Sequence, residues 1–167
     1  MKRILLLLIL ISAVLFSGCT GYDDVDSGIS DEEEVQVSAA ELYSLMTGDG
    51  GYAEWNLFPG TVELATSAGV HGDQVTIYVS DNAYDAIEAG ETTMPAESII
   101  LKEGYDSDGE LEELVVMYKV EGYNPDDGDW FWALYSPEGD VSAEGKVSGC
   151  INCHQKKRSN DFVFTGA

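Results

Sequence analysis

The chain has 167 residues, of which 31 are Asp or Glu and only 8 are Lys or Arg, so its formal net charge at pH 7 is -23. Such a surface repels phosphate backbones and anionic lipid headgroups, which excludes nucleic acid as a partner and excludes electrostatic binding to a membrane. A basic protein partner and a well-solvated acidic surface with no partner both remain consistent with the charge.

The N-terminal segment, residues 1–18, has the pattern of a signal peptide. Lys2 and Arg3 precede an apolar run over residues 4–16, which is too short to span a bilayer comfortably. The run ends in LFSGC, which resembles a lipobox and makes Cys19 the lipidated residue, with ordinary cleavage as the alternative. We therefore expect export to the cell envelope, on the periplasmic or extracellular face, with lipid on Cys19 as the only membrane attachment.

An acidic stretch follows, and then one domain. Residues 19–37 are poor in apolar side chains, which predicts a flexible tether between the lipid and the domain. Ser38 and Glu41 form a capping box, which starts a short helix that Gly48 ends. Residues 38–167 are long enough for a single domain with one core.

Within that domain the sequence pattern is mostly that of strands separated by turns. β-branched and aromatic residues predict strands at 75–79, 98–103, 113–120 and 130–136, and a short helix is predicted at 82–90. The turn sequence DSDG should join the second and third strands in a hairpin. Short turns between successive strands imply an α+β fold, with a mainly antiparallel sheet and a few short helices. Both faces of strand 130–136 are apolar, so we expect it to be covered on both sides.

The motif Cys150-Ile-Asn-Cys153-His154 is the attachment signature of c-type haem. In that chemistry two thiols add to the vinyl groups of the porphyrin and the adjacent histidine reaches the iron. Zinc would need a fourth ligand, for which the chain offers only His71. A redox dithiol would follow a strand in a βαβ unit, whereas a plain disulfide stays open. We expect one covalent haem c, enclosed by the sheet and helices, with His154 as the axial iron ligand.

The other face of the haem decides between two functions. A protein side chain as sixth ligand would give an electron carrier, and an open position would give ligand binding or catalysis. The candidate sixth ligands are Met46, Met94, Met117 and His71, although core packing explains the methionines as well. A six-coordinate electron-transfer cytochrome c that serves a basic redox partner therefore stays open as the alternative function.

Several segments resemble, in order, those of the cytochrome P-460 family, which includes the cytochromes c′-beta. They include HGDQVTIYVSDNAYDAI, VVMYKVEGYNPDDGDWFWALY and GCINCHQKKRSNDFVFT, and the likeness covers about residues 38–165. The resemblance implies a mainly antiparallel domain, usually a homodimer, with one five-coordinate haem c. Members either oxidise hydroxylamine, with a lysine cross-linked to the porphyrin, or bind nitric oxide in an apolar pocket.

The resemblance also implies roles for particular residues. Lys102, in IILKEGY, is the best match for the cross-linking lysine, with an ordinary exposed strand lysine as the alternative. Glu103 is the candidate base for hydroxylamine oxidation, with Glu97 and Asp73 as further carboxylates. Thr76 stands nearest the place of the family's distal arginine, and this departure weakens the hydroxylamine-oxidising interpretation.

The combined prediction is an exported monohaem c protein that binds or oxidises nitric oxide or hydroxylamine at an open iron site. Its electrons would pass to a redox protein partner. If the chain is an enzyme, it is a hydroxylamine-oxidising haem oxidoreductase, and the sequence leaves that question open. Three aromatic residues are candidate pocket walls: Phe58, Tyr78 and Trp132.

Overall fold

The computed structural model of the protein describes residues 35–165, which belong to one compact unit. The predicted signal peptide, Cys19 and most of the tether lie outside the described residues. Within residues 35–165, no helix has the length and apolar character needed to cross a membrane.

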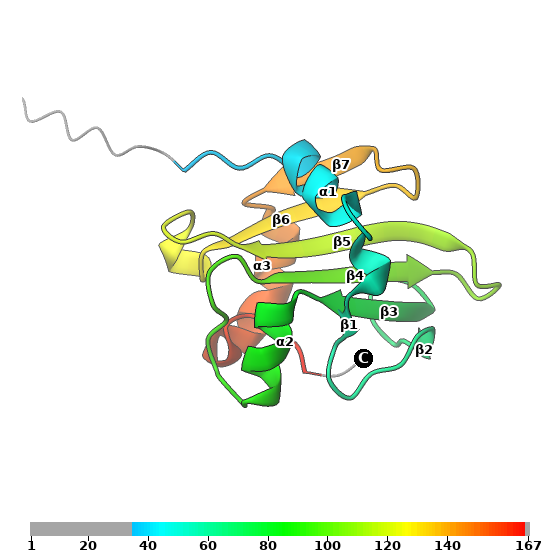
Figure 1. Ribbon diagram of the computed structural model, residues 1–167, viewed down its shortest axis with the longest axis horizontal. Coiled ribbons are helices and arrows are strands. Elements are labelled where there is room, and N and C mark those ends of the chain that lie inside the picture. The colour runs from blue at the N-terminus through cyan, green and yellow to red at the C-terminus, as the bar shows by residue number, and fades with distance from the viewer. Residues whose placement is uncertain (1–34, 166–167) are drawn as a thin grey trace, which may run out of the picture. The chain divides into compact units, whose positions relative to one another are not determined.

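A seven-stranded antiparallel sheet forms the centre of the domain (Figure 1). Its strands are paired in the order β1-β3-β4-β5-β6-β7, and β2 pairs with β3 beside β1. The strands are β1 (Asn56–Leu57), β2 (Ala65–Thr66), β3 (Gln74–Val79), β4 (Ile99–Tyr105), β5 (Leu111–Lys119), β6 (Trp130–Tyr135) and β7 (Val141–Gly145). The predicted antiparallel α+β fold is confirmed, as is the β4–β5 hairpin.

Three α-helices and three short 3₁₀ helices complete the domain. The α-helices are α1 (Ala39–Thr47), α2 (Asp81–Glu88) and α3 (Ser148–His154), and the 3₁₀ helices are η1 (Tyr52–Glu54), η2 (Pro125–Asp127) and η3 (Gln155–Asn160). Helix α1 begins where the capping pattern predicted, because the Ser38 hydroxyl accepts a hydrogen bond from the Glu41 backbone N–H at 3.2 Å. Helix α2 begins at Asp81, one residue before its predicted start.

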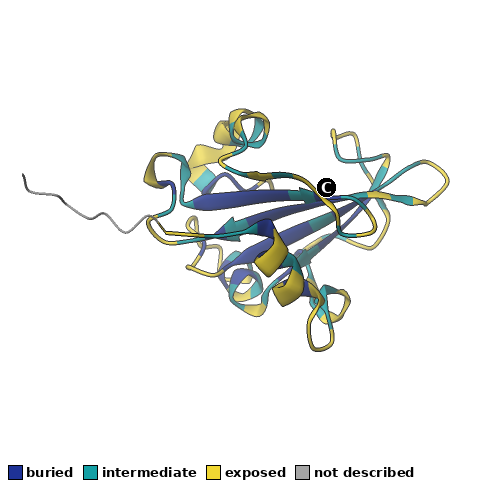
Figure 2. Ribbon diagram, turned by 90° about the horizontal axis from the view of Figure 1, so that it is seen from above, coloured by how far each residue is buried: buried dark blue, intermediate teal, exposed yellow. Residues whose placement is uncertain are grey.

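The sheet has an apolar cluster on each face, because successive residues of a strand point to opposite sides. On β6, Trp130 and Trp132 pack with Ala83 of α2 and with residues after α3. Phe131 and Tyr135 pack instead with the apolar residues of α1. The strand is therefore covered on both sides, as predicted, and Figure 2 shows buried strands between helices with exposed outer surfaces.

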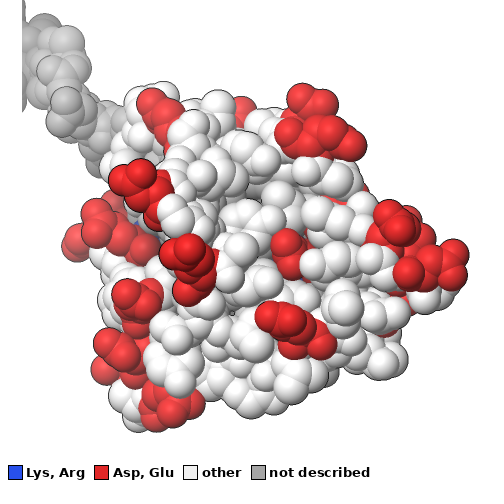
Figure 3. All heavy atoms as spheres, turned by 45° about the vertical axis from the view of Figure 1, so that its right-hand side comes forward, with Lys and Arg blue, Asp and Glu red and all other residues white. Residues whose placement is uncertain are grey.

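The surface of the domain is acidic on the face that Figure 3 shows. Asp and Glu side chains are scattered over this view, and Lys and Arg are almost absent from it. Because like charges repel, this face is unfavourable for contact with a polyanion. We name the two sides of the sheet by their helices: the α1 face and the α3 face.

Candidate haem-binding site

Helix α3 brings the three residues of the C-x-x-C-H motif together over the α3 face of the sheet. The spacing of Cys150, Cys153 and His154 puts them on one side of the helix, since residues three and four apart are neighbours there. Cys150 packs against the apolar cluster of the α3 face, and Cys153 and His154 line a cavity beside it. Both cysteines are free thiols, so both are available to a covalent ligand.

The imidazole of His154 is held in a single orientation. Its Nδ1 lies 2.8 Å from the carbonyl oxygen of Phe162. Because a carbonyl oxygen only accepts, Nδ1 must carry the proton, which leaves the lone pair on Nε2 for a metal. The ring packs against Trp132 and Phe164, with centroids 4.7 and 5.0 Å away. Burial lowers the pKa of His154, which favours the neutral, ligating form.

The cavity beside His154 has a volume of about 360 Å³ and is mostly apolar. That size lies within the usual range for cofactor and ligand pockets, roughly 300–1,000 Å³. Strands β3, β4, β5 and β6 supply one wall, and the C-terminal segment after η3 supplies another. The apolar lining includes Phe58, Ile77, Ile100, Val115, Val163 and Phe164. Phe58 and Trp132 are therefore pocket walls, as the sequence predicted.

Lys102 projects into this apolar wall from β4. It pairs with Ile77 of β3 on one side and with Val115 of β5 on the other, and all three line the cavity. Burial lowers the pKa of the Lys102 amine, because the charged form loses hydration there. The structure thus brings Lys102 and His154 to one cavity. A covalent bond from Lys102 to a porphyrin stays a prediction.

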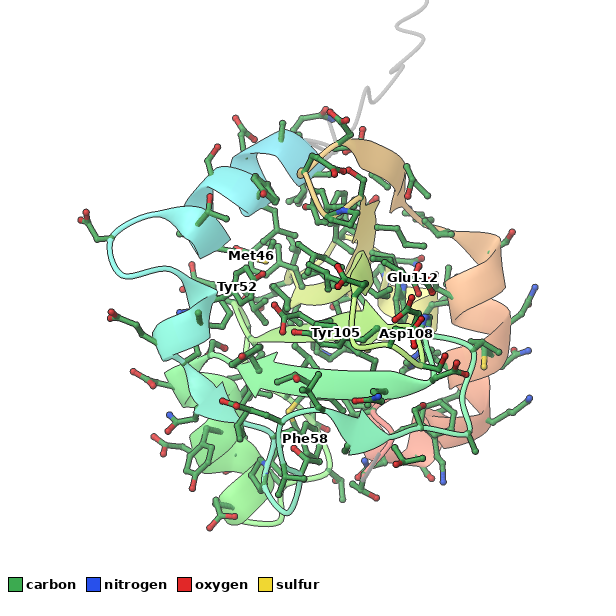
Figure 4. The ribbon with its side chains drawn as sticks, turned by 90° about the vertical axis from the view of Figure 1, so that its right-hand side faces the viewer. Met46, Tyr52, Phe58, Tyr105, Asp108 and Glu112 are labelled. Carbon is green, nitrogen blue, oxygen red and sulfur yellow. The ribbon has the colours of Figure 1, made fainter. Side chains whose placement is uncertain are left out.

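Glu103 lies on the other side of the sheet, because it follows Lys102 directly in the strand. Its carboxylate accepts hydrogen bonds from the hydroxyls of Tyr52 at 3.0 Å and Tyr105 at 2.5 Å. Figure 4 shows Tyr52 close to Met46 of α1 and apart from Phe58. The expectation that Glu103 is a base beside the iron is therefore at odds with its position. Strand alternation, which the sequence already contained, gives the reason.

Two other candidates from the sequence also face away from the cavity. Tyr78 packs on the α1 face, with its ring 5.6 Å from that of Tyr52, so it is not a pocket wall. The Thr76 hydroxyl accepts a hydrogen bond from the Leu64 backbone at 3.1 Å and also lies outside the cavity lining. Neither Glu97 nor Asp73 lines the cavity. Its described walls therefore carry no carboxylate.

The candidate sixth ligands are separated by the fold. Met46 is buried on the α1 face, and Met94 is buried on the α3 face without lining the cavity. Met117 and His71 do line it. The His71 Nδ1 lies 3.2 Å from a Glu113 carboxylate oxygen, which orients the ring. In the sequence, His71 stands out only as one of four candidate ligands, because a loop histidine before a glycine carries little signal of its own.

A close backbone contact fixes the loop that carries His71. A side chain at Gly104 would collide with the His71 carbonyl, and one at Gly72 would lie 2.6 Å from the Tyr105 carbonyl oxygen. Only glycine fits at these two positions, because the obstacle in each case is backbone. The loop therefore docks against β4 at its irregular end, where the register shifts between Gly104 and Tyr105.

The residues present fit a flat, apolar, iron-containing cofactor. The Cys153 thiol and the available Nε2 of His154 line one mostly apolar cavity, and Cys150 packs against the apolar cluster beside it. The Trp132 Nε1–H is buried there without a partner in the described structure. A buried donor without an acceptor is costly, so a bound group with acceptor atoms is expected nearby. Among residues 35–165 no three His, Cys, Asp or Glu side chains cluster as metal ligands, so His71 does not complete a zinc site.

The antiparallel sheet, the C-x-x-C-H helix and the apolar cavity define the class of protein: a cytochrome that binds haem. The Cytochrome P460 family model matches residues 50–165, so the chain belongs to the cytochrome P460 family. No curated protein matches the chain significantly.

Proposed function

We propose that the protein is an exported c-type cytochrome that carries one haem, bonded to Cys150 and Cys153 and ligated by His154. The single observation that carries this proposal is the position of His154. Its Nδ1–H is already donated to a backbone carbonyl, and its ring lines an apolar cavity next to a free thiol. Lipid on Cys19 would hold the protein at the outer side of a membrane, as the signal pattern predicts.

The ligand that suits this cavity best is nitric oxide. Haem iron supplies an open coordination position for a small molecule when no protein side chain occupies it. The described walls are mostly apolar and hold no carboxylate, so they offer no anionic base. Nitric oxide is small and neutral and needs no hydrogen-bond donor, whereas hydroxylamine oxidation requires a group that accepts protons.

A second candidate function rests on His71. This imidazole lines the cavity and is oriented by the Glu113 carboxylate, so it could accept a proton from hydroxylamine and share it with that carboxylate. Lys102, in the same cavity, would form the cross-link to the porphyrin that the resemblance implies. Electrons would then leave to a basic redox protein, since the visible surface is acidic.

A third arrangement would make the protein an electron carrier. The Met117 side chain lines the cavity, and a thioether is a haem ligand in carriers of this kind. Met117 also belongs to the apolar cluster with Trp132, which explains its burial without any iron. Spin state distinguishes the two cases.

The test is intact mass with ferric and ferrous spectra, after expression with the haem-attachment machinery. The wild type should gain one covalent haem, and a Cys150→Ala/Cys153→Ala variant should gain none. A peptide that joins Lys102 to haem, absent from Lys102→Gln but present in the exposed control Lys146→Gln, would support hydroxylamine oxidation. High-spin spectra without that peptide would support nitric oxide binding. Wild-type protein without haem would overturn the proposal.

Electron transfer has its own signature in the same samples. Low-spin spectra in both oxidation states, converted to high spin by Met117→Leu, would show a methionine ligand. Hydroxylamine turnover that disappears in His71→Gln, with nitric oxide binding retained, would assign the proton acceptor. The wild-type fold should persist in both variants, because each replacement nearly conserves volume.

A further inference from the structure

A buried ion pair lies close to the haem motif without taking part in the cavity. The Lys119 Nζ donates to both carboxylate oxygens of Asp161, at 2.8 and 2.6 Å, and to the Gly128 carbonyl at 2.7 Å. Each of the two charged residues is only 8% exposed. Neither lines the cavity, and the proposed function makes no use of them.

Asp161 is fixed by more than its lysine. The Oδ2 atom also accepts a hydrogen bond from the Met94 backbone N–H at 2.8 Å, and the Asp161 carbonyl accepts one from the Trp130 indole at 2.8 Å. The residue is therefore bonded to β5, to β6 and to the segment that precedes β4. Its position relative to the sheet is set by three separate parts of the chain.

The backbone at this point has an unfavourable conformation. Asp161 has φ 50° and the following Phe162 has φ 66°, so two successive non-glycine residues are left-handed. Each is less favourable than an ordinary conformation for a residue that carries a side chain. Such a turn persists only where its surroundings hold it, and the bonds to Asp161 do so here.

The turn places one acceptor where the haem motif needs it. Its Phe162 carbonyl receives the Nδ1–H of His154 at 2.8 Å. A hydrogen bond of this kind fixes the orientation of a ligating imidazole and raises its basicity. Gly128 makes room for the turn, since a Cβ at that position would lie 2.8 Å from the Phe162 ring.

We propose that the Lys119–Asp161 ion pair is a positioning device for the axial histidine: it holds the left-handed turn that aims the Phe162 carbonyl at His154. This inference rests on the proposed ligation of haem by His154. Stability alone is a poor reason for such a pair, because buried ion pairs are often replaced by apolar groups without loss. Apolar residues in place of Lys119 and Asp161 would not hold the turn that orients His154.

The test compares two variants in the haem-loaded protein. Lys119→Met/Asp161→Asn removes both charges together and so leaves no unpaired buried ion. The matched control is Asp127→Asn, which breaks the Arg158–Asp127 pair at 3.2 Å, near the same segment but on the surface. The readout is the iron–histidine stretching band in the ferrous resonance Raman spectrum, with haem content from intact mass.

We expect the double variant to keep its haem while the band moves to lower frequency and broadens, because a loosened carbonyl makes His154 a weaker donor. The control should keep the wild-type band. An unchanged band in the double variant, with haem content intact, would overturn the inference and leave the proposed function standing.

Two further measurements separate the remaining outcomes. If the double variant fails to fold, Asp161→Asn takes its place, because its amide oxygen can still accept from the Met94 N–H while the ion pair is lost. An unchanged band in that variant would overturn the inference. If the wild type carries no haem, the proposed function fails, and NMR decides the positioning role alone. A hydrogen-bonded His154 Nδ1–H should appear in wild-type protein and weaken in the double variant, and its persistence would refute that role.

Discussion

Replacing Glu103 with leucine distinguishes a structural carboxylate from a catalytic one. Glu103 is 8% exposed and accepts hydrogen bonds from Tyr52 and Tyr105 on the α1 face. Leucine has a similar size and accepts no hydrogen bond. The variant therefore leaves two phenol hydroxyls without their acceptor while the cavity on the α3 face keeps all its walls.

The expected loss of stability follows from these two bonds. A hydrogen bond to a charged group contributes about 1.5–3 kcal/mol, so two bonds at the lower end contribute about 3 kcal/mol. Both tyrosines are only partly buried, and water will replace some of what is lost. We therefore expect Glu103→Leu to lower the free energy of unfolding by about 2 kcal/mol. Glu103→Gln retains an acceptor oxygen and should lose about half of that.

Urea unfolding at pH 7 measures the stability, and absorbance titration of the ferrous protein with nitric oxide measures ligand binding. Both variants should bind nitric oxide like the wild type. The reasoning is refuted if Glu103→Leu is as stable as the wild type. It is also refuted if ligand binding or hydroxylamine turnover collapses while stability is unchanged, since a residue on the α1 face has no direct route to the ligand.

Three further predictions concern pH, packing and a close contact. Burial, and for two of them the neighbouring Glu103, raises the pKa of three tyrosines: Tyr52, Tyr105 and Tyr135. A tyrosine whose pKa is raised by folding stabilises the folded state at every pH below the pKa in the unfolded chain, about 10. The urea midpoint of unfolding should therefore stay constant up to that pH and fall above it. A constant midpoint at higher pH would contradict this. Met46→Ala, at a fully buried position of α1, should cost about 2–4 kcal/mol in urea unfolding and leave the haem spectra unchanged. Gly104→Ala should cost about 1–3 kcal/mol, because its Cβ meets the His71 backbone, and a stable variant would mean that this loop is free to move.

Local pattern was enough to predict much of this domain. Runs of β-branched and aromatic residues predicted β3, β4, β5 and β6 close to their observed bounds, since strand propensity belongs to each segment by itself. Ser38 and Glu41 located the start of α1 because capping involves residues three apart. The C-x-x-C-H motif likewise needed no distant partner to be recognised, because its chemistry is written within five consecutive residues.

Only the tertiary structure shows which face of the sheet holds the cavity, and therefore which residues of a strand reach it. Lys102 and Glu103 are neighbours, and alternation shows only that they point to opposite sides. Which side holds the cavity depends on where α1 and α3 dock, and those helices lie far from β4 in the sequence. The position of Lys102 at the cavity and that of Glu103 away from it thus have the same origin.

The surroundings of His154 were decided in the same way. The sequence determined that a histidine follows two correctly spaced cysteines, and with it the class of cofactor. It contained no local sign that Lys119 would meet Asp161, or that the Phe162 carbonyl would accept the Nδ1–H. Those contacts join segments from separate parts of the chain, and they exist only because the folded sheet and the last turn bring buried groups within hydrogen-bonding distance, where each must find a partner.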